Sequence, residues 1–480
     1  MNAGPASGGS RVLARLFARQ SVTRENPAGG PELRRALGLS ALIGVGLGTM
    51  LGGIFATIGV GAQSAGPAVI VSFLLSGLAC AFVSVCYAEL ASMVRVAGSA
   101  YTYAYATLGE VVAWIIGWDL LLEYGVSVAP SAASWSGAMQ GLLQSANLNL
   151  PAWAQTAHVV FTRGRLDVAH SQIDVLAFGI VLALTALLVV GIRESSLANG
   201  ILVVVQVVAM LAFVAFLAGA VKPQHLRPFA PLGWTGVVHG AALVFFAYIG
   251  FDTVTVASEE ARRPHRDVPL AVILSLAFGA VLYVAIAYVT VGNVPWRTID
   301  TNAGMTDAVK HGSHSGLLLL VVSIGALAGT TTIMLTSLLG QIRIFYVMAR
   351  DRMLPEAVAR IHPRTQTPAF TTLFTGIAIA VLAAAVPLDV LLSMVNIGTL
   401  SAFAIVCAGV VALRLTQPEL DRPFRAPLGI TAGVLGTGLC LYLMTGLEAA
   451  TWIRFVVWFA VGLAIYAGYG YRRSRLRPGD

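Results

Sequence analysis

The chain has 480 residues, of which 57% are apolar and only 11% charged, and its formal net charge is +8. A mean hydropathy of +0.81 excludes a soluble enzyme and predicts an all-α polytopic membrane protein. The positive charge does not imply a nucleic-acid partner, because the basic residues follow an orientation pattern typical of membrane proteins.

Apolar runs long enough to cross a bilayer recur along the whole chain. A hydrocarbon core about 30 Å thick needs about 20 apolar residues per helix, and this criterion predicts twelve transmembrane helices. They cover residues 36–62, 67–94, 109–143, 171–191, 197–220, 235–260, 268–292, 316–349, 367–386, 388–413, 429–447 and 451–471.

The positions of lysine and arginine predict the orientation of these helices. With both termini inside, most of the 30 basic residues fall on the cytoplasmic side, as the positive-inside rule requires. We therefore expect a basic cytoplasmic segment at 1–35, a transmembrane domain at 36–471 in the cell inner (cytoplasmic) membrane, and a cytoplasmic tail at 472–480.

The first predicted helix contains five glycines within residues 44–53. Glycine costs about 1 kcal/mol relative to alanine in a helix, and broken backbone in hydrocarbon is tolerated only where it is buried in protein or lines a cavity. We expect a break that binds a small zwitterion, with amides facing its carboxylate and carbonyls near Thr49 and Met50 facing its ammonium. The alternative is close packing of helices through glycines four residues apart.

A second interruption is predicted in the sixth helix, where residues 245–252 read F-F-A-Y-I-G-F-D. Paired interrupted helices at corresponding places in two halves point to the binding site of a secondary transporter. If the first and sixth helices correspond, one repeat covers 36–221, the second covers 235–413, and 429–471 holds two extra helices.

Acidic residues inside the apolar spans are functional candidates by default. Asp119 and Glu123 lie one helical turn apart on the third helix, and Asp252 lies beside the second break. Glu123 is a candidate for proton coupling, and Asp252 for a structural or gating role.

Motifs for nucleotide hydrolysis or metal binding are missing from the sequence. The two lysines, Lys222 and Lys310, do not belong to a phosphate-binding loop, and the eight histidines form no H-E-x-x-H pair. The four cysteines lie in apolar spans and are expected to be packing residues. No enzyme activity, cofactor or metal is therefore expected, and any driving force must come from gradients.

Several stretches together resemble the amino acid–polyamine–organocation superfamily, and within it the cationic amino acid transporter family and its bacterial members. The stretches include C-Y-A-E-L-A-S, G-W-D-L-L-L-E-Y, F-F-A-Y-I-G-F-D, L-L-G-Q-I-R-I-F-Y-V-M-A-R-D-R-M-L-P and V-N-I-G-T-L-S-A-F. The resemblance implies a LeuT-like fold, with two inverted five-helix repeats, two extra helices, and helices 1 and 6 unwound in mid-membrane.

The resemblance also implies a set of substrate contacts. The amides of Gly52 and Gly53 would bind the α-carboxylate, and Phe246 matches the aromatic gate of the family. Carbonyls around the two breaks would bind the α-amine, at Thr49, Met50, Phe246, Ala247 and Ile249.

Three positions depart from the pattern of the family. The first break, G-L-G-T-M-L-G-G-I-F, is one residue shorter than in relatives. Gln206 stands where proton-coupled bacterial relatives carry lysine, and an amide cannot titrate. This leaves uniport, exchange, or a proton route through Glu123. Ser337 is a small residue where neutral-amino-acid relatives are often bulkier, which leans toward a cationic substrate such as arginine or lysine.

We therefore expect a secondary-active amino acid transporter that works by alternating access. Its partners would be the amino acid, the lipid bilayer and, as a candidate coupling ion, H⁺. One alternative is a symporter or exchanger of neutral, alanine-type amino acids. An alternative of another class is an amino acid sensor that binds without flux.

Overall fold

The computed structural model describes residues 37–93, 101, 109–157, 161–162, 165–166, 171–190, 196–256, 261–313, 315–360, 362 and 367–471. The segments expected to be cytoplasmic, 1–35 and 472–480, lie outside these residues. The described part is almost entirely helical. Its β structure includes the antiparallel pair β1 (Phe161–Thr162) and β2 (Arg165–Leu166) and a bridge between Leu37 and Ala261.

Fifteen α-helices lie in the described part of the chain. They are α2 (Leu39–Met50), α3 (Gly53–Ala65), α4 (Val69–Met93), α6 (Glu110–Ser145), α7 (Val175–Val190), α8 (Ser196–Leu217), α9 (Gly233–Val244), α10 (Thr253–Val256), α11 (Pro264–Asn293), α12 (Gly304–Gly312), α13 (Gly316–Arg350), α14 (Ala369–Ala385), α15 (Leu388–Thr416), α16 (Ile430–Met444) and α17 (Ala449–Ile465). Short 3-10 turns are η1 (Gly66–Ala68), η2 (Ala152–Ala154), η3 (Ala218–Ala220), η4 (Pro223–Leu226), η5 (Phe245–Tyr248) and η7 (Glu356–Ala359), and η8 (Tyr466–Gly470) is a π-helical turn.

Length and composition allow eight helical stretches of the described chain to cross a membrane, and one of these, Gly53–Met93, joins α3 to α4. The helices α2, α7, α14 and α16 are shorter and also apolar. Each predicted apolar segment overlaps at least one of these helices. The prediction of an all-helical, multi-pass membrane protein is thereby confirmed.

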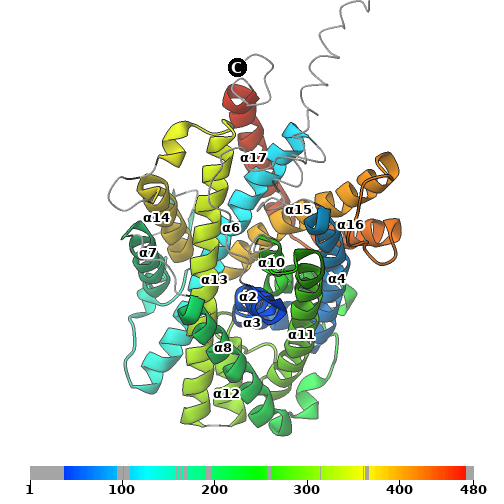
Figure 1. The fold of residues 1–480 in the computed structure, drawn as a ribbon. Helices are drawn as coiled ribbons and strands as arrows, with labels where there is room; N and C mark the ends of the chain where they lie inside the picture. Colours follow the sequence, from blue (N-terminus) through cyan, green and yellow to red (C-terminus); the bar gives the residue numbers. More distant parts are fainter. Residues whose placement is uncertain are drawn as a thin grey trace, which may run out of the picture.

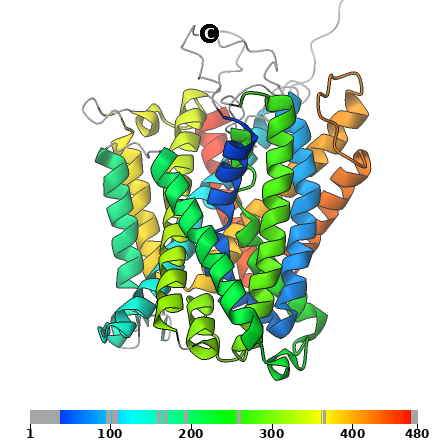
Figure 2. The ribbon, with the colours of Figure 1, turned by 60° about the horizontal axis from the view of Figure 1, so that its bottom comes forward.

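The helices form one bundle around the two half-helices α2 and α3 (Figure 1). The long helix α13 packs against α6 and α8, and α11 packs against α4 and α2. In the view of Figure 2 most helices run side by side along the same direction. The helices α7 and α14 pack on each other at one edge of the bundle.

The start of α11 differs from the sequence-based expectation. The helix begins at Pro264, before the predicted start at residue 268. Proline is well placed in the first turn, because it has no N–H group that would lack an intrahelical acceptor. Asp267 adds a negative charge in the same turn, where the helix dipole is positive.

Both predicted helix interruptions are present, and they differ in geometry. At the first, α2 ends at Met50 and α3 begins at Gly53, while Leu51 and Gly52 keep helical φ and ψ angles. At the second, η5 is followed by an extended Ile249 before α10 starts at Thr253. The first helix is thus interrupted over two residues, and the second has a longer irregular segment.

Candidate functional site

A cavity lies where the two interruptions meet α6 and α13. Its volume available to water centres is about 40 Å³, which holds about three water molecules. An amino acid needs more space, so binding must displace lining side chains. The cavity is lined by Thr49, Glu123, Tyr124, Ser127, Phe246, Ile249, Gly250, Asp252, Thr253, Ile333, Thr336 and Ser337.

Glycines at the first interruption allow a very close approach of neighbouring helices. A Cβ atom added to Gly53 would lie 2.7 Å from the Cα of Ala247, and one added to Gly52 would collide with the carbonyl group of Gly329 on α13. The N–H group of Gly52 has no backbone acceptor among the described residues. The two glycines therefore bring the first break against both the second break and α13.

Gly250 shapes the second interruption. Its φ angle is +114°, a conformation that favours glycine over residues with a Cβ atom. Its carbonyl oxygen lies 2.8 Å from the hydroxyl of Thr49, which is also 2.9 Å from the hydroxyl of Thr253. Side-chain hydroxyls thus connect the two breaks at the edge of the cavity.

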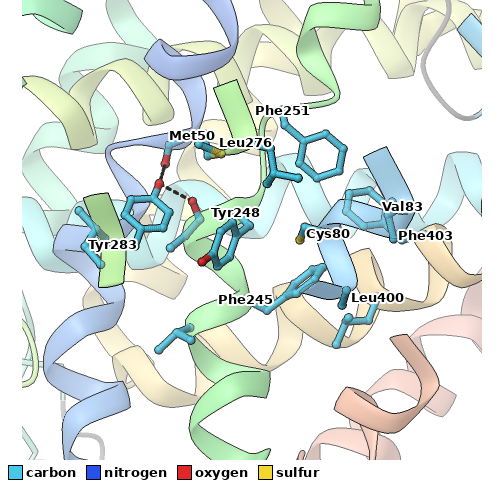
Figure 3. Packing of buried hydrophobic residues seen from close by; sticks show 14 of the residues in the cluster. Met50, Cys80, Val83, Phe245, Tyr248, Phe251, Leu276, Tyr283, Leu400 and Phe403 are labelled. Carbon is cyan, nitrogen blue, oxygen red and sulfur yellow. Dashed lines mark hydrogen bonds between the residues drawn. The ribbon is translucent and has the colours of Figure 1, made fainter. Parts of the chain in front are cut away.

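A second connection between the breaks comes from Tyr283 on α11. Its hydroxyl lies 2.8 Å from the carbonyl oxygen of Met50 and 2.7 Å from that of Ala247. Figure 3 marks the hydrogen bond between Tyr283 and Met50 with a dashed line. The tyrosine is fully buried, and its single O–H hydrogen is shared by two acceptors. The carbonyl groups of Met50 and Ala247 are therefore engaged by the protein itself.

Two carboxylates line the cavity without a cationic partner. Glu123 and Asp252 are 2% and 6% exposed, and Oε2 of Glu123 and Oδ1 of Asp252 have no hydrogen-bond partner among the described residues. In the same part of the chain, neither forms an ion pair with lysine or arginine. Burying an unpaired carboxylate is costly, so this wall is suited to a proton or a cationic ligand.

Another part of the cavity wall carries hydroxyl groups from α6 and α13. The hydroxyl of Ser127 lies 3.1 Å from that of Ser337, and Thr336 donates to the carbonyl oxygen of Thr332 at 2.7 Å. Ile333 completes this wall with an apolar side chain. The cavity can therefore offer both hydrogen bonds and apolar contact to a side chain.

Gln206 on α8 lies behind the first break, outside the cavity lining. It is fully buried, and neither Nε2 nor Oε1 has a hydrogen-bond partner among the described residues. A Cβ atom added to Gly329 would collide with Oε1 of Gln206. The same added atom would lie 3.1 Å from the Cα of Gly52. Gln206 thus lies beside the contact between the first break and α13.

The structure brings together about half of the residues predicted for the site. The cavity lining includes Thr49, Glu123, Phe246, Ile249, Asp252 and Ser337. It does not include Met50, Gly52, Gly53, Ala247 or Gln206. Sequence reasoning missed Tyr124, Ser127, Thr253, Ile333 and Tyr283. Of these, Ser127 lies one helical turn beyond Glu123, so helical spacing alone could have placed it on the same face.

Two interrupted helices that meet at a buried, partly acidic cavity in an apolar helical bundle define a membrane transport protein. Comparison with known proteins agrees, because residues 37–467 match the family described as amino acid permease. The chain belongs to the amino acid permease family, and the resemblance to the amino acid–polyamine–organocation superfamily is confirmed.

Individual relatives cover most of the chain. It is 41% identical over 450 residues to the branched-chain amino acid permease of Bacillus subtilis (strain 168), which spans 94% of this chain and 96% of that protein. It is 39% identical over 467 residues to the methylthioribose transporter of the same organism, with 97% and 100% covered. The vacuolar cationic amino acid transporter 4 of Arabidopsis thaliana is 36% identical over 408 residues, which cover 81% of this chain and 65% of that protein.

We expect Tyr283→Phe to destabilise the protein, because it leaves the buried carbonyl groups of Met50 and Ala247 without a donor. Each unsatisfied group costs about 1–3 kcal/mol, so thermal unfolding of the purified protein in detergent should occur several degrees lower. Tyr288→Phe on the same helix is the control, because Tyr288 is 43% exposed. Equal melting temperatures for the two variants would contradict the bridging role of Tyr283.

Proposed function

We propose that this chain is a secondary-active amino acid transporter that works by alternating access. The observation that carries the proposal is the cavity at which both interrupted helices meet α6 and α13. Membership of the amino acid permease family supports the same class of substrate. An amino acid sensor without flux would use the same cavity, and the uptake assays below distinguish the two.

For the architecture we propose twelve membrane-spanning helices in the LeuT-like arrangement. The first repeat would cover 36–221 and the second 235–413, with 429–471 as the two extra helices. The interrupted helices α2–α3 and α9–α10 would then be the first helix of each repeat, which agrees with their contact in the fold. Both termini would face the cytoplasm at the inner membrane, in keeping with the basic residues.

The zwitterionic part of the substrate would bind between the two breaks. We assign the carboxylate to the amides of Gly52 and Gly53, since the Gly52 N–H group has no backbone acceptor among the described residues. The amine would be bound near Thr49 and the carbonyl groups of Phe246 and Ile249. The carbonyl groups of Met50 and Ala247, first expected in this role, would contribute only if Tyr283 released them.

For the side chain we favour a cationic amino acid such as arginine or lysine. Glu123 and Asp252 offer negative charge in the cavity lining, and the small residues Ser127 and Ser337 leave room there and offer hydrogen bonds. A cationic side chain would supply the charge that these carboxylates lack. The relatives named cationic amino acid transporters are consistent with this choice.

A neutral, branched-chain substrate is the second candidate. Phe246, Ile249 and Ile333 give the cavity an apolar share, and a branched-chain amino acid permease is 41% identical to this chain. In that case the two carboxylates would be neutralised by protons, and Glu123 would belong to the coupling route alone.

Uptake of labelled arginine and leucine into proteoliposomes, at two pH values and with all twenty amino acids as competitors, tests the proposal. We expect saturable arginine uptake, and Glu123→Gln should lower the arginine-to-leucine ratio about tenfold, a loss of about 1.4 kcal/mol. Leucine uptake without arginine uptake would establish the neutral candidate. Absence of uptake and exchange for every amino acid would contradict transport altogether.

Substitutions at Gln206 test whether transport is coupled to protons. Because the glutamine amide cannot titrate, proton coupling would have to use Glu123. A lysine at this position adds a group that exchanges protons, so Gln206→Lys should strengthen the pH dependence of the initial uptake rate. Gln206→Met is the control, because it has similar length without a titratable group. A pH profile equal to that of the wild type would count against the assignment.

A further inference from the structure

A third buried carboxyl group lies next to the cavity but does not line it. Asp119 is on α6, four residues before Glu123, so the two side chains share one face of the helix. It is only 1% exposed. Its distance from the lining residues along α6 places it toward the end of the bundle where α6 begins.

The carboxyl group of Asp119 accepts a hydrogen bond from an uncharged hydroxyl group. The hydroxyl of Ser401 on α15 donates to Oδ2 at 2.6 Å, while Oδ1 has no hydrogen-bond partner among the described residues. A Cβ atom added to Gly398 would lie 2.7 Å from Oδ1. The glycine on α15 thus leaves the space that the second oxygen occupies.

The charged groups around Asp119 and Glu123 are predominantly acidic. Glu123 has electrostatic interactions with both Asp119 and Asp252. The adjacent Tyr124 has electrostatic interactions with Glu123, Asp252 and Arg343 of α13. From α15, the groups that meet Asp119 are Ser401 and Gly398, neither of which carries charge. No lysine or arginine forms an ion pair with these three carboxyl groups in the described part of the chain.

Two carboxylates one helical turn apart in a low-dielectric interior repel each other strongly. This repulsion keeps at least one of the two carboxyl groups, Asp119 or Glu123, protonated. A proton can pass between them in the state with one proton and one negative charge. The unpartnered oxygens, Oδ1 of Asp119 and Oε2 of Glu123, are the atoms at which this proton can reside. Residues one turn apart on a helix have Cβ atoms about 5–6 Å apart, so the transfer requires a side-chain rotation or a bridging water molecule.

We propose that Asp119 is a second proton-carrying carboxyl group of the transport cycle, which exchanges a proton with Glu123. The inference rests on the proposed amino acid transport and on proton coupling through Glu123. In the exchange, the O–H bond of the Glu123 carboxyl group breaks and an O–H bond forms on Asp119. Glu123 becomes a carboxylate, Asp119 becomes neutral, and the number of protons is unchanged. Glu123 can then face the cationic part of the substrate while the proton stays inside the protein.

The experiment compares two activities of the same proteoliposomes, both measured as entry of external labelled arginine or leucine, whichever the wild type transports. The first is accumulation driven by a pH difference of one unit, which can sustain about a tenfold gradient per proton. The second is counterflow exchange without a pH difference. We expect Asp119→Asn to reduce the ratio of driven accumulation to counterflow about tenfold, and Asp119→Glu to restore most of it.

Asp174 provides a matched control outside the site. Its carboxyl group is also buried, accepts a hydrogen bond from a serine (Ser136, 2.6 Å), and has one oxygen, Oδ2, without a partner among the described residues. Asp174→Asn should therefore leave the ratio as in the wild type, whatever it does to stability.

Three results would overturn the inference alone. One is an Asp119→Asn protein with the same ratio as the wild type, and another is an equal loss of accumulation and counterflow, which indicates a structural role. A wild type that exchanges substrate but shows no pH-driven accumulation also overturns it, while the proposed amino acid transport stands. Only the absence of counterflow in the wild type would overturn both.

Discussion

The hydroxyl group of Tyr283 is the interaction on which the geometry of the cavity depends. It joins the carbonyl oxygens of Met50 and Ala247, one at each helix interruption, across 233 and 36 residues of chain. Each interruption leaves backbone groups without helical partners, and such groups are costly in an apolar interior. One side chain satisfies a carbonyl group of both breaks and so keeps them side by side. The contact of Gly53 with Ala247 is possible only because no Cβ atom intervenes.

This arrangement determines what the cavity offers to a ligand. Tyr283 engages two carbonyl groups of the breaks, and the polar side chains that line the cavity include the hydroxyls of Thr49, Thr253, Ser127 and Ser337 and the carboxylates of Glu123 and Asp252. The acidic groups have no cationic partner among the described residues, and Gln206 adds none. A proton or a cationic substrate therefore has to provide the missing charge. Ligand binding and proton uptake are then linked through the same carboxyl groups.

The sequence predicted the positions of both interruptions, because crowded glycines and a Gly–Phe–Asp sequence disfavour a continuous helix inside an apolar run. Glu123 and Asp252 were equally accessible to prediction, since charges are rare in such runs. Tyr283 was not, because a tyrosine in an apolar span has no distinctive pattern and its partners are remote in sequence. For the same reason the sequence could not reveal that Gly52 faces α13 and Gly53 faces Ala247. Those directions depend on helix packing, not on spacing.

The most direct test of the central claim is a cryo-EM structure of the protein with its transported amino acid bound. We expect density for the amino acid between Thr49 and Gly250 on one side and Ser127 and Ser337 on the other, with the Tyr283 hydroxyl still between the two breaks. Density elsewhere would contradict the claim, for example in the smaller cavity between α3, α6 and α12 that includes Phe55, Ser134 and Thr306.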